Sequence, residues 1–98
     1  MADAKVDALP VPPEALDQGG IEVLRAFIVG GKLEVSLRRA FEEPDVWGML
    51  IADLARHAAR IYATETDLGE DQALTKIRAM YDAELDTPTD PGTTSAVS

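Results

Sequence analysis

The chain has 98 residues, 46% of them hydrophobic, and a formal net charge of −9, which suits one acidic globular domain rather than two. It contains no cysteine, so disulfide frameworks, iron–sulfur clusters, thiol nucleophiles and cysteine zinc sites are excluded. The excess of acidic side chains lies in residues 1–20 and 64–98, whereas residues 21–63 are balanced. Because phosphate binding needs a concentrated basic surface, we expect no nucleic-acid partner.

The N-terminal segment, residues 1–20, is marked by prolines and by two adjacent glycines. Each proline fixes its own φ and restrains the preceding residue. We therefore predict an extended arm, which lies against the domain or serves as a proline-rich recognition peptide. The segment has no charged leader followed by an apolar block, and no apolar run in the chain approaches the roughly 18 residues of a membrane span. We expect a soluble cytoplasmic protein without membrane partners.

Residues 21–40 predict a β-hairpin, with strands over about 21–29 and 32–40 joined by Gly30 and Gly31. Two glycines supply the positive φ angles that two-residue hairpin turns require. This turn gives the hairpin an aliphatic face, which we define as Leu24, Ala26, Ile28, Leu33, Val35 and Leu37. A slip of one residue would turn half of these side chains to water, so the turn and the pattern support each other.

The opposite side of the hairpin is a mixed face, defined as Val23, Arg25, Phe27, Val29, Lys32, Glu34, Ser36 and Arg38. It is more apolar than a fully solvated face usually is. We expect it to contact a protein partner, through the candidate interaction residues Val23, Arg25, Phe27, Val29 and Arg38. Basic groups around an aromatic ring also suit single-stranded nucleic acid, but Glu34 and the acidic ends of the chain argue against that reading.

Two amphipathic helices are predicted after the hairpin, over about 44–63 and 69–85. The first has a large apolar stripe at helical spacing, comprising Trp47, Leu50, Ile51, Leu54, Ala58, Ile61 and Tyr62. We expect this stripe to cover the aliphatic face of the hairpin. An alanine flank on the same helix, Ala52, Ala55, Ala59 and Ala63, permits close approach of another element. The second helix is expected to direct inward Leu74, Ile77, Met80, Tyr81 and Leu85, and Asp67 with Glu70 resembles a capping box at its start.

This order of elements predicts an α+β fold in which residues 21–86 form a single compact domain and residues 87–98 a disordered tail. A two-stranded hairpin is marginally stable alone, and its two free edges tend to recruit partners. A homodimer that joins two hairpins into a larger sheet would satisfy both needs.

The chain has one constellation of charged groups around a histidine, on the first helix: Asp53, Arg56, His57 and Arg60. Asp53 and His57 are four residues apart, so the carboxylate could orient an imidazole base. No nucleophile or second acid accompanies them, and this pair offers two of the four ligands that a structural zinc site usually needs. We therefore assign no catalytic residue, no cofactor-binding residue and no metal ligand, and we expect a protein that is not an enzyme.

The segments VLRAFIVGGKLEVSLR and PDVWGMLIADLARHAAR resemble a family of small uncharacterised bacterial proteins, classed as a domain of unknown function. The resemblance covers roughly residues 9–85. Its most specific parts are Pro44, Trp47 and Gly48, together with the run from Ala52 to His57. The resemblance implies a compact α+β domain and no catalytic residue, substrate or cofactor.

The sequence thus favours a non-enzymatic, acidic, cytoplasmic interaction module that self-associates through the hairpin. Two alternatives stay open. One is a small-molecule-binding protein or cryptic enzyme that uses the flank of Asp53, Arg56, His57 and Arg60, and the other is a chaperone-like partner of a basic protein.

Overall fold

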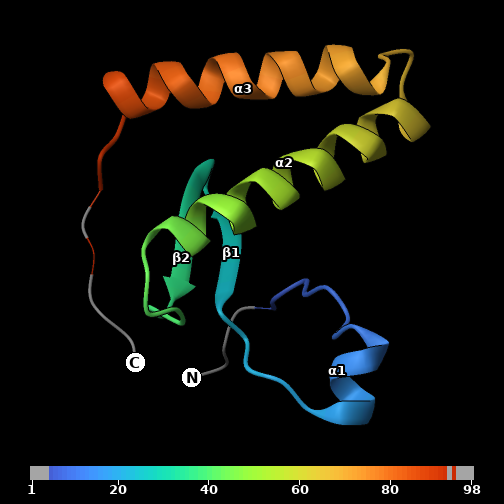
Figure 1. Cartoon of the computed structure of the whole chain (residues 1–98), viewed down its shortest axis with the longest axis vertical. Coiled ribbons are helices and arrows are strands. Elements are labelled where there is room, and N and C mark those ends of the chain that lie inside the picture. The colour runs from blue at the N-terminus through green and yellow to red at the C-terminus, as the bar shows by residue number, and fades with distance from the viewer. Residues whose placement is uncertain (1–4, 93, 95–98) are drawn as a thin grey trace. The chain divides into compact units, whose positions relative to one another are not determined.

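A computed structural model describes residues 5–92 and 94 of the chain (Figure 1). The elements in chain order are α1 (Pro13–Gln18), β1 (Leu24–Val29), β2 (Lys32–Leu37), α2 (Asp45–Glu65) and α3 (Glu70–Asp86). A hairpin followed by two helices confirms the predicted α+β class. The chain divides into two units, Met1–Arg38 and Arg39–Ser98. That residues 21–86 form one compact domain, and that two hairpins pair into a larger sheet, stay predictions.

The N-terminal segment contains a short helix where extended backbone was predicted. The amide groups of Ala15 and Leu16 donate to the carbonyl oxygen of Pro12 at 3.0 and 3.2 Å. Pro13 suits the first helical position, because its fixed φ is helical and its missing N–H would have no partner there. Gly19 follows the helix with a φ of 81°. The prediction of an extended arm over residues 1–20 is therefore wrong for α1, and residues 1–4 lie outside the described residues.

The hairpin has the predicted register. Leu24 pairs with Leu37, Ala26 with Val35 and Ile28 with Leu33, in an antiparallel two-stranded sheet. The turn residues Gly30 and Gly31 have φ angles of 57° and 82°, as a type I′ turn requires. The strands end earlier than predicted, at Leu24 and Leu37, and the amide of Arg38 adds one more bond, to the carbonyl of Val23 at 3.2 Å.

Both predicted long helices are confirmed to within about two residues. At the end of α2, the amide and hydroxyl of Thr66 donate to the carbonyl of Tyr62 at 2.9 and 2.7 Å. At the start of α3, the Gln72 side chain accepts a hydrogen bond from the amide of Gly69 at 2.8 Å. The cap of α3 is therefore Gly69 with Gln72 rather than the expected Asp67 with Glu70, since Glu70 already lies within the helix.

Helices α2 and α3 form a helical hairpin that is packed closely near its loop. Ala59 and Ala73 are the two buried residues of this pair, with 0% and 2% of their surface exposed. Their small side chains let the two backbones approach, and the helices diverge away from the loop (Figure 1). The burial of Ala59 agrees with close approach at one residue of the alanine flank, whereas Ala52, at the other end of the flank, is exposed. That the large apolar stripe covers the hairpin stays a prediction.

The large apolar stripe lies about a third of a turn around α2 from the alanine flank. Trp47 and Leu50 are half-buried, whereas Ile51, Leu54, Ile61 and Tyr62 are exposed. In α3, Leu74 and Ile77 are half-buried, but the other residues expected to face inward, Met80, Tyr81 and Leu85, are exposed. The prediction is wrong for these three because α3 diverges from α2 toward the C-terminal end of α3 (Figure 1).

A strained turn precedes α2. Ala40 has a φ of 62°, the one positive φ at a non-glycine among the described residues. The amide of Phe41 donates to the carbonyl of Arg39 at 2.7 Å, which closes a γ-turn around Ala40. The indole N–H of Trp47 donates to the same carbonyl at 2.7 Å, and its ring meets that of Phe41 edge-on at 5.6 Å. Trp47 therefore holds the turn in place.

The segment that follows α3 is hydrogen-bonded to the last turn of that helix. The amide and hydroxyl of Thr89 donate to the two carboxylate oxygens of Glu84 at 2.8 and 2.6 Å. Thr89, in the segment predicted to be disordered, is thus bonded to α3; that residues 87–98 are disordered stays a prediction. Residues 93 and 95–98 lie outside the described residues.

Candidate functional site

The aliphatic face of the hairpin carries large exposed side chains. Ile28 and Leu33, which pair across the strands next to the turn, are 73% and 64% exposed. Val35 and Leu37 are exposed to a lesser degree. Burial of one such aliphatic side chain contributes roughly 1.5–3 kcal/mol of stabilisation. This face is therefore the first candidate for a contact surface.

The mixed face, where the candidate interaction residues were predicted, is partly covered by its own side chains. The Arg25 guanidinium lies 5.5 Å from the centre of the Phe27 ring, and a carboxylate oxygen of Glu22 holds Arg25 at 3.1 Å. Val23, Phe27 and Arg38 are half-buried, whereas Arg25 and Val29 are exposed. The prediction that this face contacts a partner stays a prediction, and Phe27 is less available than the sequence suggested.

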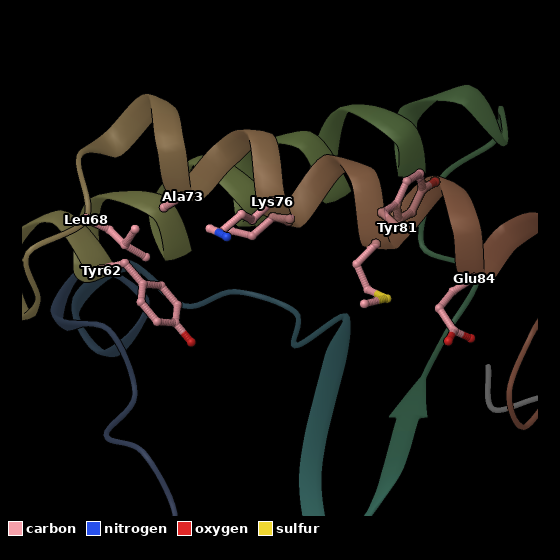
Figure 2. Close-up of a pocket in the computed structure, with 8 residues that line it drawn as sticks. Tyr62, Leu68, Ala73, Lys76, Tyr81 and Glu84 are labelled. Carbon is pink, nitrogen blue, oxygen red and sulfur yellow. The ribbon is translucent and has the colours of Figure 1, made fainter.

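A groove of about 470 Å³ runs along α3, and we call it the Lys76 groove. Its lining comes from the end of α2, the following loop and one side of α3: Tyr62, Leu68, Ala73, Lys76, Ile77, Met80, Tyr81 and Glu84 (Figure 2). Most of these side chains are apolar or aromatic. The groove could not be predicted from the sequence, because Tyr62 and Leu68, which complete the lining that α3 supplies, are placed only by where α2 ends.

The two charged groups of the Lys76 groove stand at different ends. Lys76 directs its ammonium group toward Leu68 and Tyr62, and Glu84 lies at the far end (Figure 2). The side-chain and backbone hydrogen bonds from Thr89 lower the pKa of Glu84 below its ordinary value, because they favour the charged carboxylate. The groove therefore has a positive and a negative end.

A second, smaller hollow of about 260 Å³ lies where α2 and α3 diverge. Its lining is Gly48, Ile51, Ala52, Arg56, Leu74, Arg78, Tyr81 and Asp82. Of the four charged residues predicted to act together, Arg56 lines this hollow, and Arg60 approaches Glu70 at 3.9 Å. Asp53 and His57 are exposed on α2 and line neither depression. The structure thus does not gather the four into one cavity.

No group of three or more histidine, aspartate or glutamate side chains in the described residues could hold a metal ion. In the same part of the chain, none of the helices combines the length and hydropathy needed to cross a membrane.

The fold defines a small α+β protein built from a hairpin and a helical hairpin. The chain belongs to the family described as Domain of unknown function (DUF5076), which matches residues 8–89 and confirms the resemblance inferred from the sequence. A solved structure from the photosynthetic bacterium Rhodopseudomonas palustrus, described as a candidate pyruvate dehydrogenase, is 46% identical to this chain. The match covers 96% of this chain and 98% of that one, with a TM-score of 0.78. None of the curated proteins compared with the chain matches it.

Proposed function

We propose that the protein is a non-enzymatic, cytoplasmic interaction module that self-associates through the β1–β2 hairpin. The observation that carries this proposal is the exposure of Ile28 and Leu33 on the aliphatic face. A partner that covered both side chains would gain roughly 3–6 kcal/mol from their burial alone. That gain is large for a hairpin of two six-residue strands.

The backbone of the hairpin favours a second copy of this chain as the partner. Within the described residues each strand has one neighbour, so each leaves one edge whose amide and carbonyl groups join no sheet ladder. Such edges readily pair with another strand, and a second copy of the chain offers a strand of the same length and pattern. Edge pairing in a symmetric dimer would extend the sheet to four strands and bring two aliphatic faces to one side.

The competing possibility is that the chain covers the hairpin by itself, with the large apolar stripe of α2. Sedimentation velocity over a range of concentrations separates the two. We expect the wild type to sediment as a dimer, and a monomeric wild type at high concentration would contradict the proposal.

Variants locate the contact. Leu33→Glu places a charge on the aliphatic face and should weaken dimerisation by at least about tenfold, because the symmetric dimer brings two like charges to the same apolar side of the sheet. Ser36→Glu introduces the same charge on the mixed face of the same strand and serves as the matched control. Phe27→Glu tests the mixed face directly. If only Phe27→Glu dissociates the dimer, the contact lies on the face that the sequence favoured.

The name of the Rhodopseudomonas palustrus protein suggests pyruvate oxidation as another activity. The polar groups that line the Lys76 groove are one ammonium, one carboxylate and two phenols, and the carboxylate is already bonded to Thr89. Pyruvate-dependent reduction of NAD by the purified protein, supplied with thiamine diphosphate, would overturn the non-enzymatic part of the proposal.

A further inference from the structure

We propose that the Lys76 groove binds a medium-chain aliphatic carboxylic acid, with the carboxylate at Lys76 and the chain along α3. This inference concerns the Arg39–Ser98 unit and does not depend on self-association through the hairpin.

The groove has the size and lining of a small-molecule site. Its volume of about 470 Å³ lies within the roughly 300–1,000 Å³ of ligand pockets, which are mostly apolar with a few polar groups that fix orientation. The apolar part is formed by Leu68, Ile77 and Met80, with the rings of Tyr62 and Tyr81. Methionine and tyrosine adapt to flexible apolar chains, since one is unbranched and the other presents a flat ring.

Lys76 supplies the recognition of the acid. It is the one basic residue that lines the groove, and the ion pairs formed within the described residues involve arginines instead. Its ammonium points toward Leu68 and Tyr62 (Figure 2), so a carboxylate bound there would contact a cation beside apolar surface. A single ammonium matches a single carboxylate in charge.

Glu84 sets the direction of the bound molecule. It follows Lys76 by eight residues, which is about 12 Å along a helix axis. Thr89 donates two hydrogen bonds to Glu84 and keeps its carboxylate charged, so a second anion is disfavoured at that end. The acid therefore has its head at Lys76 and an aliphatic chain that ends before Glu84.

The acidic surroundings exclude larger anionic partners. Helix α3 carries Glu70, Asp71, Asp82 and Asp86 in addition to Glu84. A membrane surface or a nucleic acid presents many negative charges and would be repelled by them. A small acid with one charge reaches Lys76 without that penalty.

Decanoate is a suitable probe, because its extended chain is comparable in length to the groove. In a titration of the full-length protein followed by ¹H–¹⁵N NMR, we expect amide shifts confined to residues 62–89. Lys76→Glu should weaken binding by about tenfold, and Lys76→Arg should change it by no more than about twofold. Lys32→Glu makes the same charge change in the hairpin and should leave the affinity unchanged. Far-UV circular dichroism checks that each variant is folded.

Head-group analogues complete the test. Decanol and decyltrimethylammonium keep the chain and lose the carboxylate, so both should bind at least about fivefold more weakly than decanoate. The inference is overturned if decanol binds as well as decanoate, if Lys76→Glu binds as the wild type does, or if the shifts fall on the hairpin. Absence of binding at millimolar decanoate would overturn it as well, and would leave the dimer of the proposed function untouched.

Discussion

The hairpin and the helix pair differ in where they place large and small apolar side chains. This difference accounts for both candidate surfaces. The hairpin gathers large aliphatic residues on one face, where Ile28 and Leu33 are exposed. The helix pair buries two alanines, Ala59 and Ala73, and leaves Met80 and Leu85 in water. Close approach of two helices needs small residues at the contact. Large residues that flank such a contact are then free to line grooves or meet partners.

The two units also reach positive φ by different means. The hairpin turn uses Gly30 and Gly31, which have no Cβ to clash. The turn before α2 uses Ala40 and depends on Phe41 and Trp47, which both bond to the Arg39 carbonyl. The hairpin turn is therefore favoured by its own glycines, whereas the turn at Ala40 is stabilised by hydrogen bonds from Phe41 and Trp47.

The sharpest test of the comparison is to enlarge the alanine contact. Ala73→Leu inserts three carbons where 2% of the residue is exposed, and overpacking of this kind costs about 1–3 kcal/mol. Urea unfolding followed by circular dichroism measures the change in the free energy of unfolding. Ala79→Leu makes the same substitution at an exposed position of α3 and should stay within about 0.5 kcal/mol of the wild type. Equal stability of the two variants would break the argument that alanines hold the helices together.

A reciprocal pair of substitutions compares the two turns. Gly31→Ala puts a Cβ at a φ of 82° and should destabilise the hairpin by about 1 kcal/mol. Ala40→Gly relieves the same strain before α2 and should raise stability by less than about 1 kcal/mol, because glycine also loses more entropy on folding. Amide hydrogen exchange in β1 and β2 reports the first effect, and the urea midpoint of the helices reports the second. A loss of stability in Ala40→Gly would mean that the γ-turn carries no strain.

The smallest expected effect is at the end of α3. Glu84 has a lower pKa in the folded protein than its ordinary value of 4.5. Its contact with Thr89 therefore adds stability above about pH 4.5, and this contribution is lost as the pH falls through the lower, folded pKa. Thr89→Val removes the hydroxyl donor and should move the pKa of Glu84 back toward its ordinary value. Carboxyl ¹³C NMR titration of both proteins measures the shift, and Thr87→Val is the control because Thr87 lies outside this contact.

Most of the architecture followed from local signals. Two glycines between alternating apolar strands set the hairpin register, since any slip would expose half of the aliphatic face. Helical periodicity placed α2 and α3, because both helices carry apolar residues at helical spacing. The short helix α1 differs from the prediction because Pro10, Pro12 and Pro13 together favour extended backbone, although a proline such as Pro13 also suits the first position of a helix.

The sequence by itself determined which residues share a face, because that follows from the periods of strand and helix. Only the tertiary structure decided which face of α2 meets α3. On α2, the alanine flank and the large apolar stripe are equally regular in the sequence, and the approach of Ala73 selected the flank. The turn from α2 into α3 then assembled the Lys76 groove from Tyr62, Leu68 and one side of α3. No local pattern could reveal it, since Tyr62 and Leu68 lie beside α3 only after the two helices have packed.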